Sequence, residues 1–263
     1  MDLGLKGRRA LVMGGTKGLG RSIADALAEE GASLVISGRD QRRLDIAATQ
    51  LRAKGAASVS GFPGDVANPD DMNRLYDAAV AAMGGVDILV LNHGGPPPCT
   101  ASQMKESDLT LWFTSIVVSP LRMANLALPA MRAQKFGRVI VVGSTGMQHP
   151  IPYLALSNTL RASVWAWVKT MSGEVAEEGV TINVLAPGSI LTDRTTETSA
   201  KNAAAKGITV EQVLADGAKE IPARRYGQPS EYGPMGAFLA GNTGSYITGS
   251  MIRVDGGRVR SLV

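Results

Sequence analysis

A chain of 263 residues with 44% hydrophobic and 19% charged side chains has the composition of a soluble globular protein and is long enough to bury one large core. Its net charge of +4 comes from Lys and Arg residues scattered among acids, which does not indicate the concentrated basic surface of a nucleic-acid-binding protein. No apolar run approaches the roughly 18 residues of a membrane-spanning helix, and the N-terminal run is too short for a secretory signal. We therefore expect one cytoplasmic domain, 1–263, that binds neither nucleic acid nor a membrane.

Seven short apolar runs, each followed by a turn, are predicted to form buried strands. In chain order they are RRALVMGG (8–15), ASLVISGR (32–39), ASVSGFPGD (57–65), VDILVLNHGG (86–95), GRVIVVGS (137–144), VTINVLAPG (180–188) and SMIRVDGG (250–257). Their Val, Ile and Leu residues are continuous and do not alternate with polar ones, which is typical of a parallel sheet covered on both faces.

Helices are predicted between these strands, where apolar residues recur at three- and four-residue steps. Their ranges are 18–30, 40–54, 69–83, 106–134 and 153–178. Strands that alternate with helices indicate an α/β fold, a doubly wound parallel sheet of about seven strands with helices on both faces, as in the Rossmann fold.

Residues 189–224 form a long polar insertion with helical propensity between the last two predicted strands. Insertions of this length in compact domains are usually functional or disordered. We interpret the segment as a mobile lid over a substrate site; an irregular surface insertion is the alternative.

Glycines open the first predicted helix. The stretch LVMGGTKGLGRSIADAL places Gly14, Gly18 and Gly20 after the first strand and at the start of the helix. A turn without side chains lets backbone amides and the helix N-terminus approach a pyrophosphate. Because a strand precedes the glycines and a helix follows them, the pattern predicts a dinucleotide site.

The end of the second strand favours NADP(H) over NAD. Gly38 and Arg39 stand where a dinucleotide fold that binds NAD has an acid for the ribose 2′-hydroxyl. An arginine there can pair with a 2′-phosphate, and Lys17 could add a second charge. The alternative is that both are solvated surface charges.

From Lys6 to Gly257 the chain resembles the short-chain dehydrogenase/reductase family. The glycine turn has the family's spacing, GDV (64–66) looks like its adenine-binding Asp-Val, and ILVLNHGG stands where it has Asn-Asn-Ala-Gly, with Leu91 at the first Asn. NVLAPGSILTD and RRYGQPSEYGPMGAFLAGNTGSYITGSMIRVDGG are similar to its nicotinamide-side and C-terminal segments. The resemblance implies a homodimer or homotetramer and a small-molecule carbonyl or alcohol as substrate. It implies cofactor contacts from Gly14, Thr16, Lys17, Gly18, Leu19, Gly20, Arg39, Asp65, Val66, Asn92, Gly94, Asn158, Pro187, Gly188, Ile190 and Thr192.

The catalytic positions depart from the family. Its members use Ser, Tyr and Lys, assisted by an Asn; Tyr passes the proton and Lys, four residues later, lowers the pKa of Tyr and holds the ribose. The resemblance places Ser144 at the serine, but Leu154 at the tyrosine, Asn158 at the lysine and Ile116 at the asparagine. The sequence therefore predicts an atypical active site that lacks the Tyr-Lys pair.

Two neighbouring residues are candidates for the missing proton donor. One helical step rotates a side chain by about 100°, so Tyr153 would point away from the cofactor unless it precedes the first turn, which Pro150 and Pro152 allow. Tyr153 is otherwise an aromatic residue of the pocket wall. His149 lies in the loop after Ser144 and has a suitable ordinary pKa. We take Ser144, Tyr153 and His149 as the catalytic candidates.

Neither Asn158 nor Arg161 replaces the lysine fully. Asn158 can hydrogen-bond ribose hydroxyls but carries no charge, and Arg161, one turn further, carries a charge but cannot relay protons. A structural salt bridge is the alternative for Arg161.

Three functions stay open. The first is an NADP(H)-dependent oxidoreductase with a remodelled proton path, whose apolar wall of Met147, Ile151, Leu154 and Ile190 favours aliphatic or aromatic ketones. The second is non-redox chemistry on the same scaffold, such as isomerisation or elimination. The third is an inactive NADP(H) sensor or partner subunit. Cys99, the only cysteine, has no neighbours at metal-ligand spacing, and we predict no metal site.

Overall fold

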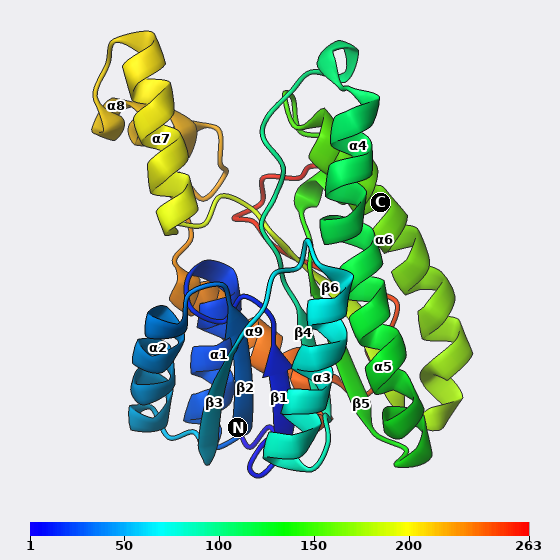
Figure 1. Cartoon of the computed structure of the whole chain (residues 1–263). Coiled ribbons are helices and arrows are strands. Elements are labelled where there is room, and N and C mark those ends of the chain that lie inside the picture. Colours follow the sequence, from blue (N-terminus) through cyan, green and yellow to red (C-terminus); the bar gives the residue numbers. More distant parts are fainter. Residues whose placement is uncertain (263) are drawn as a thin grey trace.

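The computed structural model describes residues 1–262, and within them the seven predicted strands form one sheet in the order β3-β2-β1-β4-β5-β6-β7 (Figure 1). Every pairing is parallel. The strands are β1 (Arg9–Val12), β2 (Ser33–Gly38), β3 (Ser58–Pro63), β4 (Ile88–Leu91), β5 (Gly137–Val142), β6 (Val180–Pro187) and β7 (Met251–Val254). Because the chain order reverses beside β1, loops that follow β1 and β4 diverge and leave a crevice at the carboxyl ends of the strands. The predicted doubly wound fold is confirmed.

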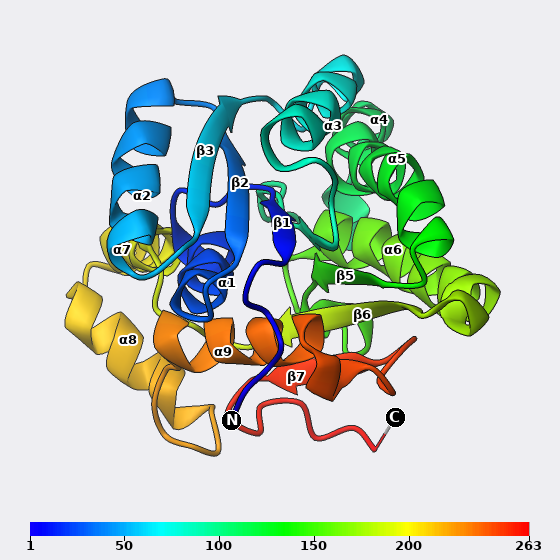
Figure 2. The ribbon, with the colours of Figure 1, turned by 90° about the horizontal axis from the view of Figure 1, so that it is seen from below.

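Helices cover both faces of the sheet (Figure 2). One face carries α1 (Gly18–Glu29), α2 (Gln41–Ala53) and α9 (Pro229–Ala240), and the other carries α3 (Pro69–Met83), α5 (Ser119–Ala133) and α6 (Ala155–Val175). Each face buries its own apolar core. Val, Ile and Leu run continuously along the central strands because both sides of the sheet are covered.

The helix α9 was absent from the predicted helices, because Gly233, Pro234 and Gly236 weaken the apolar pattern. Packing decides it: α9 lies directly on α1, and a Cβ at Gly233 would fall on the carbonyl oxygen of Ser22. Small residues here let the two helices approach closely.

The predicted helix 106–134 is interrupted. It consists of α4 (Glu106–Phe113), a π-helical turn (Thr114–Val118) and α5. Pro120 has no N–H to donate to the carbonyl of Ile116, and the N–H of Ser119 bonds instead to Thr114, five residues back. The resulting bulge changes which side chains of this segment face the crevice.

The helical stretch Glu106–Ala133 is 28 residues long and, by length and composition alone, apolar enough to cross a membrane. This corrects the expectation that no segment reaches that length. Half of its most apolar window is buried inside the protein, where Met123 and Ala127 belong to the core. A core helix passes the same test, so the length by itself assigns no membrane role.

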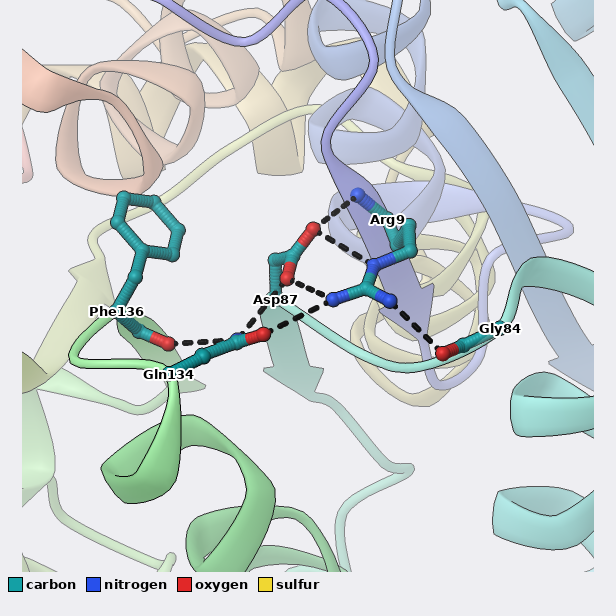
Figure 3. Close-up of polar contacts among 5 residues, drawn as sticks. All are labelled: Arg9, Gly84, Asp87, Gln134 and Phe136. Carbon is teal, nitrogen blue, oxygen red and sulfur yellow. Dashed lines mark hydrogen bonds and ion pairs between the residues drawn. The ribbon is translucent and has the colours of Figure 1, made fainter.

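A polar network joins the amino ends of β1 and β4 to the end of α5 (Figure 3). The carboxylate of Asp87 accepts hydrogen bonds from the backbone N–H of Arg9 (3.0 Å), from its Nε (2.9 Å) and Nη2 (2.5 Å), and from Nε2 of Gln134 (3.0 Å). Burial by itself raises the pKa of Asp87, but these hydrogen bonds outweigh burial and hold the pKa below its ordinary value.

We expect Asp87→Asn to lower the free energy of unfolding by about 2–3 kcal/mol at neutral pH, because the Arg9 guanidinium loses its counter-charge. Since the folded-state pKa of Asp87 is depressed, this stabilisation is present above the unfolded-state pKa of about 3.9 and is lost as the pH falls through the folded-state pKa. The gap between wild type and variant should therefore shrink below about pH 4. Urea unfolding across this pH range measures it.

Glu29→Gln is the matched control, because its ion pair with Lys54 (2.7 Å) is exposed on the surface. We expect a change below about 0.5 kcal/mol for this variant. Equal losses in the two variants would contradict a special role for the Arg9–Asp87 pair.

Candidate functional site

A cavity of about 1490 Å³ lies at the carboxyl ends of the strands. Its lining includes residues that follow β1, β2, β4, β5 and β6. The far side is closed by α7 (Asp193–Lys206) and α8 (Val210–Lys219), which stand beyond the strand ends in Figure 1. The insertion 189–224 is thus largely helical and walls the cavity; its role as a mobile lid stays a prediction.

The glycine turn lies where a pyrophosphate could bind. Gly14 and Gly18 adopt left-handed conformations (φ +60° and +63°), and α1 begins without a side-chain cap, so its first amides have no side-chain acceptor. Asn92 holds the turn through Nδ2, which donates to the carbonyl oxygens of Met13 (3.2 Å) and Gly14 (3.4 Å). The expected contacts Gly14, Thr16, Lys17, Gly18, Leu19, Asn92 and Gly94 all line the cavity. Gly20 does not line it and packs behind the turn.

Basic residues border the part of the cavity that follows β2 and β3, which we call the adenosine end because the expected adenosine contacts lie there. Arg39, Asp65 and Val66, which are expected to contact the cofactor, line this end. Arg39 forms no ion pair within residues 1–262, so its charge is available to a phosphate. Arg43 also lines this end, a residue the sequence reasoning missed. Its place in the first turn of the helix that follows Arg39 was the available signal.

The segment after β6 borders another part of the cavity, which we call the nicotinamide end because the expected nicotinamide contacts lie there. Pro187, Gly188, Ile190 and Thr192, which the family resemblance implied as cofactor contacts, line the cavity. Their contact with the cofactor stays a prediction. Thr192 caps α7 by accepting a hydrogen bond from the N–H of Thr195 (3.4 Å), which joins the end of the sheet to the insertion.

Ser144 lies at the other side of this end, directly after β5. Its Oγ accepts a hydrogen bond from the N–H of Gly146 (3.0 Å), which leaves its O–H free to donate into the cavity. Leu154, Ser157 and Arg161 line the cavity from the start of α6. The residue at the expected tyrosine position therefore faces the site with an apolar side chain.

The other candidates lie outside the lining. Tyr153 is 71% exposed, in a left-handed conformation (φ +62°), with its carbonyl bonded to the N–H of Cys99. α6 begins after it, at Ala155, two residues later than predicted. His149 is exposed as well. The structure does not bring these two side chains to Ser144, because the turn that precedes α6 directs them outward.

Asn158, expected to bind the cofactor, is engaged elsewhere. Its Nδ2 donates to the carbonyl of Ile151 (2.9 Å), and its Oδ1 accepts from the N–H of the same residue (3.4 Å). Asn158 thus fastens the turn before α6 and does not line the cavity. Amide groups can form this paired contact, whereas a lysine could supply only the donor.

The π-helical turn brings a residue that sequence reasoning passed over. Ser115 lines the cavity, whereas Ile116, placed at the position of the family's asparagine, is buried in the core. The changed helical phase explains this difference of one residue. Pro120 was the one local sequence signal for the π-helical turn.

Charge at the nicotinamide end is unusual. Burial lowers the pKa of Arg161 to about 10, and the charge of Arg194 contributes. Burial also lowers the pKa of His93 to about 3, with contributions from Arg161 and Arg194, so His93 is neutral at physiological pH. Both arginines and His93 line the cavity. His93 therefore does not change its charge near neutral pH.

A doubly wound parallel sheet with a glycine turn at the first crossover and an uncapped helix N-terminus defines a dinucleotide-binding protein. The family model described as enoyl-(acyl carrier protein) reductase matches residues 14–258. The chain belongs to the short-chain dehydrogenase/reductase family, which confirms the family resemblance.

Relatives match over nearly their whole length. A 3-oxoacyl-(acyl-carrier-protein) reductase of Vibrio cholerae is 34% identical over 97% of this chain and 98% of its own. An NADPH-dependent reductase of Bacillus subtilis is 31% identical over 97% of this chain and 99% of its own. The structure of L-sorbose reductase from Gluconobacter frateurii, complexed with NADPH and L-sorbose, is 30% identical, covers 100% of both chains and has a TM-score of 0.95.

Proposed function

We propose that this protein is an NADP(H)-dependent oxidoreductase that interconverts a small-molecule carbonyl and its alcohol with a remodelled proton path. The cofactor is NADP(H), as in the NADPH-dependent relatives. The residues fit it, because uncapped amides of α1 line the cavity and Arg39 carries an unpaired charge at the end where a 2′-phosphate would lie.

One observation carries the proposal: a single cavity extends from the glycine turn to Ser144 and Leu154. A dinucleotide bound along it would bring its nicotinamide to the end that holds Ser144, beside space for a substrate. A passive nucleotide sensor would have no need of a lined space beyond the nucleotide.

When bound, the cofactor supplies the hydride. Ser144 donates its free O–H to the carbonyl oxygen and orients it, and Ile151, Leu154 and Ile190 exclude water around the substrate. Leu154 cannot pass a proton. Tyr153 and His149 would have to move inward to do so, and in their present positions we expect Tyr153→Phe and His149→Ala to retain activity.

The test is a fluorescence titration of the purified protein with NADPH and NADH, followed by a panel of carbonyl compounds in the same cell. We expect tighter binding of NADPH than of NADH, and oxidation that depends on the carbonyl. Tight binding without oxidation by any carbonyl would favour a non-redox enzyme or a sensor. Failure to bind either nucleotide would overturn the proposal altogether.

Arg39→Ala should raise the Kd for NADPH by about 10- to 100-fold, because a charge-assisted hydrogen bond to the 2′-phosphate is lost. The Kd for NADH should stay unchanged, since NADH has no such phosphate. Arg42→Ala is the matched control: Arg42 is exposed in the first turn of α2, three residues after Arg39, and does not line the cavity. Equal weakening of both nucleotides by Arg39→Ala would contradict the assignment.

A further inference from the structure

Two arginines face the nicotinamide end of the cavity without an acidic partner. Arg161, in the second turn of α6, is only 8% exposed, and its guanidinium donates to the carbonyl of Val142 (3.1 Å) and the hydroxyl of Ser157 (3.3 Å). Arg194, in the first turn of α7, reaches across to the carbonyl of Pro96 (3.5 Å). All of these acceptors are neutral. Within residues 1–262 neither arginine forms an ion pair.

Acidic residues do line the cavity, but their charges are directed to other partners. Asp193 faces Lys17 (3.7 Å), Glu220 faces Arg258 (3.7 Å), Asp40 faces Arg43 (3.8 Å), Asp216 faces Lys219 (2.8 Å), and Asp65 accepts from the N–H of Ala67 (2.9 Å). The protein therefore places positive charge at this end and supplies no carboxylate against it.

An unpaired buried guanidinium is costly, because it loses its hydration and gains no counter-charge. The cost is visible in the lowered pKa of Arg161, which burial and Arg194 together bring to about 10, still well above neutral pH. His93 beside them is neutral and does not compensate. A planar guanidinium matches a carboxylate in geometry, and an anion in the cavity would remove the imbalance.

The anion belongs to the substrate end and not to the phosphates of the cofactor. Arg161 bonds Val142, two residues before Ser144, whereas the glycine turn and Arg39 serve the pyrophosphate and the 2′-phosphate at the other strand ends. An apolar wall of Ile151, Leu154 and Ile190 borders the same space. The site thus combines two positive charges, a hydroxyl donor and an apolar surface.

We propose that Arg161, assisted by Arg194, binds a carboxylate of the substrate, so that the enzyme reduces apolar keto acids to hydroxy acids in preference to neutral ketones. This inference rests on the proposed function. In the reaction the carbonyl carbon gains the hydride of NADPH, which leaves as NADP+, and the carbonyl oxygen gains a proton from solvent water, while the carboxylate is unchanged. The apolar part of the substrate contacts the wall of Ile151, Leu154 and Ile190. From sequence alone, that wall favoured aliphatic or aromatic ketones without a charge.

The experiment compares 4-methyl-2-oxopentanoate with its methyl ester, a neutral substrate of nearly the same shape, by following NADPH oxidation. For the wild type we expect kcat/KM about 100-fold higher for the acid. Arg161→Met should lower kcat/KM for the acid by about 100-fold and leave the ester within about threefold. Arg161→Lys should restore part of the loss. An ester reduced as well as the acid would overturn the inference and leave the reductase function intact.

Arg194→Met serves if Arg161→Met fails to fold, because Arg194 is exposed. We expect it to lower kcat/KM for the acid by about 10-fold without raising the Kd for NADPH. Arg258→Met is the matched control, a cavity-lining arginine already paired with Glu220, and should not change the preference for the acid. A rise in the Kd for NADPH in Arg161→Met or Arg194→Met would assign these residues to the cofactor and overturn the inference.

A readout independent of turnover separates this inference from the proposed function. Calorimetry on the NADP-saturated protein compares 4-methylpentanoate with 4-methylpentanamide. Binding of the acid alone, abolished in Arg161→Met, supports the carboxylate site even if no carbonyl is reduced, in which case the reductase function fails. Equal binding of acid and amide, or binding of neither, overturns the carboxylate site.

Discussion

Ser144→Ala is expected to lower kcat for carbonyl reduction by about 100-fold or more, the usual effect of removing a hydrogen-bond donor to a developing oxyanion. The hydroxyl already accepts a hydrogen bond from the N–H of Gly146 (3.0 Å), which fixes its oxygen and leaves its proton for the substrate. If Leu154 stands at the tyrosine position, as we predict, Ser144 carries more of this work than in a site with two hydroxyl donors. Single-turnover oxidation of NADPH measures the chemical step directly.

The Kd for NADPH should stay within about threefold in Ser144→Ala, because we assign Ser144 to the substrate and not to the nucleotide. Ser199→Ala is the control, a buried serine that lines the same cavity from α7. If both variants turned over normally, the carbonyl would have to be held by another group, and Ser115 and Ser157 are among the other hydroxyls that line the cavity.

Gly20→Ala should raise the Kd for NADPH by about 100-fold, a loss of roughly 2.7 kcal/mol of binding free energy. A Cβ on Gly20 would lie 2.5 Å from the carbonyl oxygen of Gly14 and 2.5 Å from Nδ2 of Asn92. A backbone atom cannot turn aside as a side chain can, so the glycine turn itself must shift away from its pyrophosphate geometry. Fluorescence titration with NADPH measures the change.

Gly84→Ala separates this clash from ordinary backbone strain. Gly84 is left-handed (φ +76°), but a Cβ there meets nothing within 4 Å, and the residue does not line the cavity. We expect about 1 kcal/mol lower stability and an unchanged Kd for NADPH. Normal NADPH binding by Gly20→Ala would show that the turn tolerates the added methyl group.

Much of the nucleotide half of the site could be predicted from short stretches of sequence. Gly14 and Gly18 could be predicted from their place between a strand and a helix, and Arg39 from its place after the second strand. Such residues lie in tight turns at strand ends, so their backbone positions follow from the local chain. The nicotinamide end was harder to predict from sequence. Its side chains come from α6, the π-helical turn and α7, and the placement of these elements relative to one another depends on packing.

Tyr153 and Arg161 illustrate that difference. Both lie within a few residues of one helix start, yet one points to solvent and the other enters the cavity. The start of α6 is set by the turn at Tyr153 and by the amide of Asn158 closing on Ile151, contacts that no periodicity reveals. The position of the Arg161 guanidinium then depends on a long-range contact, its hydrogen bond to the carbonyl of Val142 at the end of β5.

Periodicity and turn chemistry, which act over a few residues, were enough to predict the seven-stranded parallel sheet, the glycine turn and the position of Arg39 beside the cavity. Tertiary packing was needed to establish that Ser115 and not Ile116 faces the cavity, that Tyr153 lies outside it, and that α9 packs on α1. It also decided that Arg161 and Arg194, distant in the chain, share one space without a counter-charge. Those outcomes depend on helix phase and on long-range contacts, which are set when the helices pack against the sheet.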